Sequence, residues 1–460
     1  MNTRWTVLRQ AAISLLLISL ALGAGARTRP HYGGTLRVET EGDALAQRGG
    51  LAERLIFNGL TRLEADGTAQ PALAVRWAAE NNDHRWQFWL RPGVHFSDGS
   101  PLTSSSVETS LIAACAANCP WTTVHAVGAT VIFTGDSPMP NLPALLAGVD
   151  FPIQHPASAN PSLASPGPNI GTGAFQNEGY ANGVLTLAAN DSCWEGRPFL
   201  DSIVITGHKS VRDQWLDLSV GRADVVEVPA EQLRQAREQR FAVVASPPVS
   251  LLALSVADSG ALGNANLRAA IALAVDRSAL SNVIYQKQGE VAASLLPSTL
   301  TGYGFLFSPD RDLNKARELR GGLAPAPLML STWGNAAMQL AAQRIALNLR
   351  EAGFNVQVAI ASGPQQALHS DLVLLQLTRA SNEPAAALEV FLRDAGVATP
   401  VMETAPAGLF RVEHDFLETH KLVPLLYLPR AYAVAGRVRD LRLSPDGMPL
   451  LAGASLEDAP

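Results

Sequence analysis

The residue types that most often carry catalysis are scattered through this chain of 460 residues rather than gathered in a motif. The sequence contains no G-x-S-x-G turn, no H-E-x-x-H pair and no Walker lysine, the spacings that activate a serine, bind zinc or hold phosphate. His414 and His420 are close, but six positions on a helix place them on different faces. We therefore predict no catalytic residue, no metal site, no cofactor and no enzymatic activity.

The three cysteines are Cys115, Cys119 and Cys193. They contain no C-x-x-C pair, so a metal site is a poor interpretation. Cys115 and Cys119 end a predicted helix before Pro120, and a small disulfide loop there would require that helix to fray. A disulfide between these two residues and a pair of free buried thiols therefore both remain open at this stage.

The composition indicates an ordered protein with large cores. The chain is 47% hydrophobic and 17% charged, which argues against global disorder. Its length is enough for two or three domains. The net charge is −6, and no dense run of lysine and arginine is present, so we expect no nucleic-acid partner.

Residues 1–26 have the pattern of a secretory signal. Arg4 and Arg9 provide the positive start, and residues 11–23 form an apolar core too short for a comfortable membrane span. No cysteine follows that core, which argues against a lipid anchor. We expect a mature periplasmic protein that begins near Arg27, with an uncleaved N-terminal anchor as the alternative.

The elements that would position a binding site are clearest in residues 86–111. Alternating apolar side chains at positions 86–90 predict a strand with one buried face. The Asp98-Gly99 pair predicts a turn that requires positive φ at the glycine. Ser105 and Glu108 have the spacing of a capping box, so a helix should begin between them.

The same stretch resembles solute-binding protein family 5, the extracytoplasmic binding proteins of peptide- and nickel-type ABC importers. In that family an aromatic strand leads into a segment of the form LR-G-V-F-DG-PL. The matching residues here are Leu90, Arg91, Gly93, Val94, Phe96, Asp98, Gly99, Pro101 and Leu102. Further stretches resemble the family at residues 55–77, 185–205, 218–228, 266–280 and 438–451.

The resemblance implies an α/β fold of the two-lobed periplasmic-binding-protein type (type II, Venus-flytrap), with an extra α/β subdomain in the first lobe. We assign residues 27–57, 165–250 and 422–460 to the first lobe, 58–164 to the inserted subdomain, and 251–421 to the second lobe. The family normally has several helices after the strand that ends near residue 377. This chain is short there, so we expect a shortened second lobe.

Part of the second lobe can be predicted without the resemblance. A short strand at residues 328–330 precedes apolar side chains at helical spacing over 338–349. Gly353 follows as a helix stop, and residues 354–358 alternate as a strand. This order predicts a parallel, right-handed βαβ unit. Residues 371–377 form another apolar run, which predicts a buried strand.

Two apolar segments should cross between the lobes, one from Leu251 to Val256 and the other from Leu422 to Val434. We predict these four end residues as hinge positions. Lobes tied by only two strands can rotate and close on a ligand without repacking either core.

The resemblance also implies where cargo lies, because family members bind it between the lobes. Peptide binders in the family hold the ligand's amino group with an acidic residue in a D-P stretch, whose nearest match here is Glu383-Pro384. Glu39 and Glu41 follow the first strand, where the family has cleft residues. Trp333 follows the predicted strand that ends at Leu330 and would line the cleft. The alternatives are surface charges for the glutamates and a core position for the tryptophan.

We therefore predict the extracytoplasmic solute-binding component of an ABC importer. It would capture a small peptide or peptide-like solute by hinge closure and deliver it to an ABC permease in the membrane, acting as a monomer. The shortened second lobe favours one alternative, a non-transport sensor or partner-binding module built on the same fold. No motif identifies the cargo.

Overall fold

The computed structural model of the protein describes residues 31–457, apart from 46–49, 65–67, 116–118, 148–150, 159–168, 305, 323–325, 380–382, 399, 401 and 403–404. The predicted signal segment lies outside the described residues. Within them, no helix combines the length and the apolar character needed to cross a membrane.

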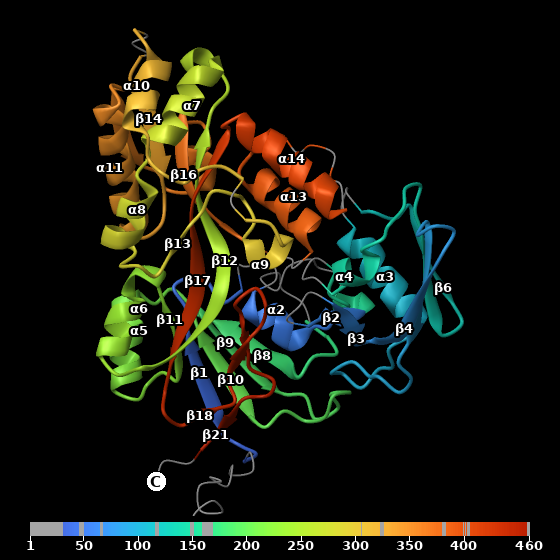
Figure 1. The fold of residues 1–460 in the computed structure, drawn as a ribbon. Helices are drawn as coiled ribbons and strands as arrows, with labels where there is room; N and C mark the ends of the chain where they lie inside the picture. The colour runs from blue at the N-terminus through green and yellow to red at the C-terminus, as the bar shows by residue number, and fades with distance from the viewer. Residues whose placement is uncertain are drawn as a thin grey trace, which may run out of the picture.

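Among the described residues, one hydrogen-bonded sheet of 11 strands runs through both lobes. Its order is β15-β14-β16-β12-β17-β11-β1-β10-β9-β8, and β13 pairs with β17. The bounds are β1 (Thr35–Glu39), β8 (Phe175–Ala181), β9 (Val184–Ala189), β10 (Ser202–Thr206), β11 (Val225–Val228), β12 (Ala242–Val256), β13 (Glu290–Val291), β14 (Leu328–Thr332), β15 (Val356–Ile360), β16 (Leu372–Thr378) and β17 (Leu422–Val434). The long strands β12 and β17 run side by side between the lobes (Figure 1).

The first lobe is built around β1, which lies between β10 and β11 and is parallel to both. Leu36 and Val38 of β1 point into its core with Phe175 and Ile203. The short helices are α2 (Leu51–Ile56), α5 (Val211–Ser219) and α6 (Leu233–Glu238), with the 3-10 turn η2 (Ala230–Gln232). The small C-terminal strands are β18 (Val438–Arg439), β19 (Arg442–Leu443), β20 (Pro449–Leu450) and β21 (Ser455–Leu456). Because parallel strands share a direction, the carboxyl ends of β10, β1 and β11 meet at one edge of the sheet.

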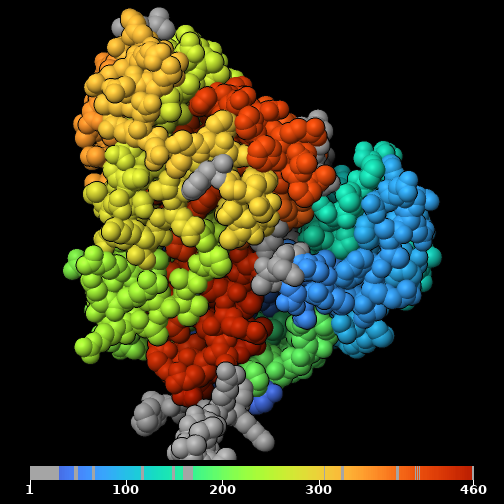
Figure 2. Space-filling model, viewed as in Figure 1, coloured from blue at the N-terminus to red at the C-terminus, as the bar shows by residue number. Residues whose placement is uncertain are grey.

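The inserted subdomain has a sheet and a core of its own. Its sheet has the order β4-β5-β7-β6. The bounds are β2 (Thr61–Leu63), β3 (Ala69–Pro71), β4 (Ala74–Glu80), β5 (Arg85–Leu90), α3 (Ser104–Ala114), β6 (Thr123–Val127), β7 (Thr130–Thr134), α4 (Leu142–Leu145) and η1 (Pro156–Ser158). Trp86 and Phe88 are buried on the predicted inward face of β5, against Phe133 of β7 and Val107 of α3. In Figure 2 the subdomain, coloured blue to teal, forms a separate mass at the right of the molecule.

The start of α3 differs from the predicted capping box. The helix begins at Ser104, and Thr103 is its N-cap, with a hydroxyl that accepts the Ser106 N–H at 3.1 Å. The Ser106 hydroxyl in turn accepts the Thr103 N–H at 3.0 Å, which completes the reciprocal pair. The prediction of Ser105 and Glu108 was therefore wrong. Glu108 is used elsewhere, because its carboxylate accepts the N–H of Ala126 on β6 at 3.1 Å.

The second lobe contains the predicted βαβ unit. β14 and β15 are parallel, and α11 (Ala336–Glu351) connects them. Gly353 has φ of 92°, which suits its role after the helix end. The remaining elements are η3 (Gly260–Gly263), α7 (Ala265–Ala274), α8 (Arg277–Ala279), η4 (Leu280–Ile284), α9 (Ser298–Thr301), α10 (Leu313–Arg320), α12 (Pro364–Ala367), α13 (Pro384–Asp394) and α14 (Pro406–Glu418). Two of these, α13 and α14, occupy the segment between β16 and β17.

The crossing strands shift the predicted lobe boundary. Ser250–Val256 of β12 pairs with β16 and also with the Leu422–Leu428 half of β17. That half of β17 therefore belongs to the sheet of the second lobe, although the predicted boundary at 421/422 assigned it to the first. Of the predicted hinge residues, Leu251, Val256 and Leu422 are buried within second-lobe pairings. Val434 pairs with β11 in the first lobe.

The pairing of β12 with β17 is irregular just before the predicted hinge position Leu251. Ala245 pairs with Ala431, Pro248 with Pro429 and Ser250 with Leu428, with a shift of register at each step. Proline supplies no N–H to a ladder, so the pairing is weakest where Pro248 faces Pro429. A further shift of register lies on the second-lobe side, between Leu252 and Ala253.

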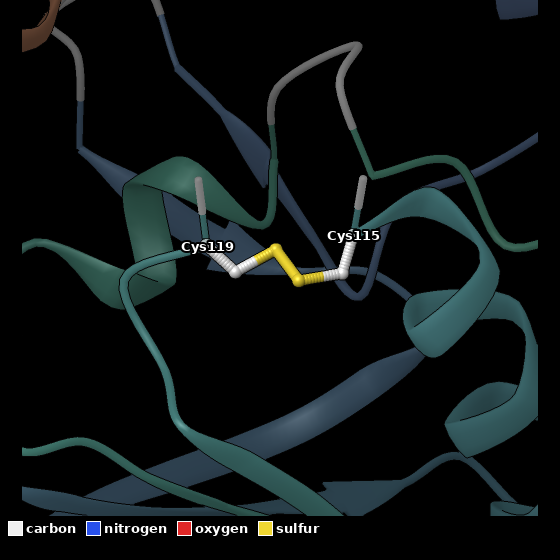
Figure 3. Close-up of a disulfide and its surroundings, with 2 residues drawn as sticks. All are labelled: Cys115 and Cys119. Atoms are coloured by element: carbon white, nitrogen blue, oxygen red, sulfur yellow. A yellow bond between two sulfur atoms is a disulfide. The ribbon is translucent and has the colours of Figure 1, made fainter. Parts of the chain in front are cut away.

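The disulfide alternative holds for Cys115 and Cys119, which are bonded to each other (Figure 3). Helix α3 ends at Ala114, so Cys115 is already outside the helix and can reach Cys119. Cys193 is a free, buried thiol.

Candidate functional site

Carboxylates gather where β1 and β11 reach the edge of the first-lobe sheet. Glu39 is the last residue of β1, Glu41 follows it, and Glu227 lies near the end of β11. The backbone N–H of Glu41 donates to Glu227 Oε2 at 2.7 Å. Two of the predicted site residues are therefore brought next to a third glutamate by parallel strand pairing.

Glu39 lies inside the first lobe, with 6% of its surface exposed. Its Oε1 is 3.5 Å from Lys209 Nζ, and that ammonium group also contacts Asp217 at 2.7 Å. Burial raises the pKa of Glu39, and the positive charge of Lys209 only partly offsets this effect. Its burial and its contact with Lys209 give Glu39 the role of a buried partner of that ammonium group.

Glu227 is held in place at the edge by its neighbours. Burial raises the pKa of its carboxyl group, while the hydrogen bond from Glu41 and the charge of Arg430 act in the opposite direction. The Glu227 N–H donates to Gln214 Oε1 of α5 at 2.9 Å. A carboxylate fixed in this way keeps its orientation without a bound ligand.

Glu231 belongs to the same group of carboxylates and contacts the second lobe. It lies in η2 directly after β11, and its Oε1 accepts a hydrogen bond from Asn335 Nδ2 at 3.2 Å. Asn335 belongs to the second lobe, where its own Oδ1 accepts the Met338 N–H at 3.1 Å and caps α11. Burial raises the pKa of Glu231, and the nearby charge of Glu41 raises it further. The Glu231–Asn335 pair is therefore a direct polar contact across the lobe boundary.

Trp333 belongs to the same second-lobe loop as Asn335. Its side chain is half-buried and packs against the cluster formed by β16, α13 and α14. The loop from β14 to α11 thus presents Asn335 to the first lobe while Trp333 anchors the loop to its own lobe. A place for Trp333 in the cleft stays a prediction.

Glu383 occupies a different position, at the N-cap of α13. Its Oε2 accepts the Ala386 N–H at 2.6 Å, and Pro384 is the first helical residue. A capping carboxylate followed by proline is a common helix start, so the Glu-Pro pair has a structural role. Ligand binding by Glu383 stays a prediction.

Two further polar contacts cross the boundary. Arg379, at the end of β16, donates from Nη2 to the Pro445 carbonyl oxygen of the first lobe at 2.9 Å. Arg237 of α6 lies 3.5 Å from Gln288 Oε1 of the second lobe. Such contacts limit how the lobes can rotate until they are exchanged for water or ligand.

Sequence reasoning missed Glu227, Glu231 and Asn335. The argument that selected Glu39 and Glu41, polar residues at a strand end, applies equally to Glu227 in the run VVEV. Asn335 carries a helix-start signal before α11. Its pairing with Glu231 spans 104 residues and depends on the lobe arrangement, for which the sequence gives no local signal.

One cavity lies elsewhere, at the junction of the first lobe and the inserted subdomain. Its volume is about 530 Å³, and it is lined by α2, β2, Trp194 and the C-terminal strands. The charged side chains around it include the ion pair between Arg62 and Glu195. We favour the lobe boundary as the candidate site because polar side chains of both lobes meet there. Every lining residue of this cavity, in contrast, precedes β12 or follows β17.

A possible metal-binding group consists of His414, Asp415 and Glu418 on α14. Two of these side chains are exposed, and exposed acidic groups of this kind are common without an ion. His420 points into another part of the second lobe, so the structure does not bring His414 and His420 together as a pair.

The chain matches the family model described as bacterial extracellular solute-binding proteins, family 5, over residues 68–399. It is 27% identical over 232 residues to the peptide transport periplasmic protein SapA of Salmonella typhimurium, an alignment that covers 47% of this chain and 42% of SapA. Over 59 residues it is 48% identical to the HTH-type transcriptional regulator SgrR of Yersinia enterocolitica, which covers 13% of this chain and 10% of SgrR. The chain thus spans less than half the length of these two relatives.

Solved structures share the fold at low sequence identity. The oligopeptide-binding protein AppA of Bacillus subtilis, in complex with a nonapeptide, is 16% identical with a TM-score of 0.78, covering 94% of this chain and 100% of AppA. NikA of Staphylococcus aureus, in complex with Ni(L-His)2, is 16% identical with a TM-score of 0.77, covering 92% of this chain and 100% of NikA. The two-lobed α/β fold predicted from the sequence is confirmed.

Proposed function

Because the chain belongs to family 5 of the bacterial extracellular solute-binding proteins, we propose that it captures a peptide-like solute between its lobes and delivers it to an ABC permease. The observation that carries this proposal is the contact between Glu231 and Asn335, which joins the two lobes at an acidic edge. A solute that enters this boundary can replace the Glu231–Asn335 hydrogen bond with hydrogen bonds of its own. It would then favour the closed arrangement by as much as its differential affinity for it.

The charge of the boundary supports recognition of a positively charged group. Glu41, Glu227 and Glu231 lie together, and Arg430 is the cation that acts on Glu227. The free amino group of a peptide could donate to Glu231 in place of Asn335. Hydrogen bonds between charged groups in a partly dry site are roughly twice as strong as neutral ones.

The remaining predicted residues have supporting roles in this proposal. Trp333 would offer an apolar wall beside the amino group. Glu39 would have a structural role as the buried partner of Lys209. Glu383 is retained as a second candidate for the amino group, since family peptide binders place an acid in this stretch.

The hinge of the proposed closure lies where Pro248 faces Pro429. The strand segments on either side of this hinge would move together with the cores of their lobes. They contain the predicted positions Leu251, Val256, Leu422 and Val434. Relatives are binding proteins, and we propose that this chain likewise has no catalytic activity. We also propose a periplasmic location, a monomeric state and no cofactor.

Binding can be tested with the purified protein and a library of short peptides, using melting temperature and solution scattering. A true ligand should raise the melting temperature and reduce the radius of gyration. Its N-acetylated form, which lacks the amino charge, should bind more weakly. Glu231→Gln should lower the affinity for the peptide with a free amino group at least about 30-fold. Removing one partner of a desolvated charge pair typically costs about 2–5 kcal/mol.

Glu383→Gln serves as the parallel variant. If it weakens binding and Glu231→Gln does not, the amino group lies at the α13 start instead. If no peptide changes melting or scattering, the peptide assignment is refuted. Equal affinity for acetylated and free peptides would refute the role of the amino charge.

The alternative is a non-transport sensor, which the local identity of 48% to the regulator SgrR favours. Uptake of a labelled peptide ligand into cells with and without this protein separates the two functions. Binding without any dependence of uptake on the protein would support the sensor.

A further inference from the structure

A buried arginine without an acidic partner lies in the second lobe, away from the lobe boundary. Arg277 of α8 is 6% exposed. Its Nε donates to the Pro424 carbonyl oxygen at 2.8 Å, and its Nη1 lies 3.4 Å from the carbonyl oxygens of Ala272 and Pro309. Among the described residues, no carboxylate lies within ion-pair distance of Arg277.

The guanidinium group keeps unused donors. Of its five N–H groups, the two on Nη2 have no acceptor among the residues that the structure describes. Burial lowers the pKa of Arg277 to about 10, so the group is still charged at neutral pH. A buried charge of this kind is costly unless a partner of opposite sign joins it.

The same arginine lines a cavity of about 190 Å³. The other lining residues are mostly apolar: Ala272, Leu273, Ala293, Phe307, Ser308, Leu417, His420, Leu422, Val423 and Pro424. Ala293, Leu422 and Val423 are buried at its inner end, whereas Ser308 is exposed and marks its opening. None of the lining residues is acidic.

These features define the chemistry of a fitting ligand. A cavity of about 150 Å³ lined by apolar side chains holds benzene, so this one is large enough for a small organic molecule. A charged guanidinium with free N–H groups on Nη2 attracts a carboxylate and can donate a charge-assisted hydrogen bond to one of its oxygens. The apolar walls favour a hydrocarbon body over a second charged or hydroxyl group.

We propose that this cavity is a binding site for a small apolar monocarboxylate, with the carboxylate on Arg277 and the hydrocarbon body against Phe307, Leu417 and Leu422. The site is independent of the proposed solute site, because its lining residues all come from the second lobe. The imidazole of His420 lies at the same cavity and can offer the bound acid an additional N–H.

Benzoate is the probe, with benzyl alcohol as a neutral compound of the same shape. Calorimetric titration of the full mature protein should give one benzoate per chain and at least ten-fold weaker binding of benzyl alcohol. Ser308→Trp should fill the opening from an exposed position and reduce benzoate affinity at least ten-fold. A crystal soaked with 4-bromobenzoate should show bromine in the cavity and the carboxylate at Arg277.

Arg277→Met should remove binding as well, but Arg277 also joins three backbone carbonyls, so this variant is informative only if its melting curve stays cooperative. Ser308→Trp and the bromine position test the proposal without that requirement. Failure of benzoate to bind the wild-type protein refutes it. Equal affinity for benzyl alcohol, or unchanged benzoate affinity in Ser308→Trp, also refutes it.

Discussion

Replacing Asn335 by aspartate should open the lobes while leaving helix α11 capped. Aspartate is as good an N-cap as asparagine, so the hydrogen bond to the Met338 N–H is kept. The Nδ2 donor to Glu231 is lost, and a carboxylate takes its place 3.2 Å from Glu231 Oε1. The substitution therefore acts on the boundary contact without removing the local helix start.

The expected magnitude follows from two effects. A hydrogen bond to a charged group contributes about 1.5–3 kcal/mol. Two like charges at about 4 Å and an effective dielectric constant of 20 repel by about 4 kcal/mol, although the side chains can move apart to reduce this. A total of at least about 2 kcal/mol would lower the closed population about 30-fold or more relative to the open one.

Solution scattering at neutral pH should therefore give a larger radius of gyration for Asn335→Asp than for wild type. Asn264→Asp is the matched control, because Asn264 is an exposed residue that caps α7 through the Asn266 N–H at 2.9 Å. It should leave the radius unchanged. Adding Glu231→Gln to Asn335→Asp supplies a new donor and should restore compact scattering.

The effect should also reverse in acid. Burial already raises the pKa of Glu231, and Glu41 adds to it. A second carboxylate at position 335 would raise it further, so the pair can share one proton as pH falls. Tyr285, the other titratable group facing Glu231, stays neutral throughout. An unchanged radius of gyration at both pH values would show that the Glu231–Asn335 contact does not control closure.

Three further outcomes follow from the structure. Asp224 is 1% exposed and accepts hydrogen bonds from Arg37 and Arg437, so Asp224→Asn should lower the free energy of unfolding in urea by about 2–4 kcal/mol, less than for a fully buried pair because the arginines are partly hydrated. Burial raises the pKa of Asp224, but the arginine hydrogen bonds lower it more, so this stabilisation should disappear as pH falls below 3.8. Equal urea midpoints for Asp224→Asn and wild type at pH 7 would contradict a stabilising role of Asp224. Gly99 has φ of 84° in open space, so Gly99→Val should cost about 1–3 kcal/mol through backbone strain alone, and an unchanged melting temperature would be inconsistent with that strain. Burial raises the pKa of Glu413, so stability should decline as pH rises above 4.5, and Glu413→Gln should make that decline shallower when unfolding is followed by tryptophan fluorescence.

The sequence was most informative where a pattern is local. The alternation at Trp86 and Phe88 identified β5, and the order strand, helix, Gly353, strand identified the parallel βαβ unit, because both depend on side-chain periodicity within one element. The helix start at α3 was placed incorrectly for a related reason. Several adjacent serines and threonines can cap a helix, and the choice of Thr103 depends on a backbone conformation that the sequence does not specify.

The candidate site was only partly predictable. Glu39 and Glu41 could be found because a strand end is a local feature, but the same rule did not distinguish the buried Glu39 from the exposed Glu41. Glu231 became a candidate only through Asn335, which lies 104 residues further along the chain. Contacts between lobes depend on how two cores are oriented, and no short sequence pattern encodes that orientation.

The position of the hinge explains why the two proposed sites should act independently. Closure requires a change of backbone where β12 and β17 lose register at Pro248, while the pairings of Ser250–Val256 stay fixed within the second lobe. The Arg277 cavity is lined by residues on the second-lobe side of that break, including Leu422 and Pro424. A ligand whose contacts are identical in the open and closed arrangements cannot change their ratio, however tightly it binds. Benzoate should therefore stabilise the second lobe against unfolding without altering the radius of gyration. A solute at Glu231 should change both the stability and the radius of gyration.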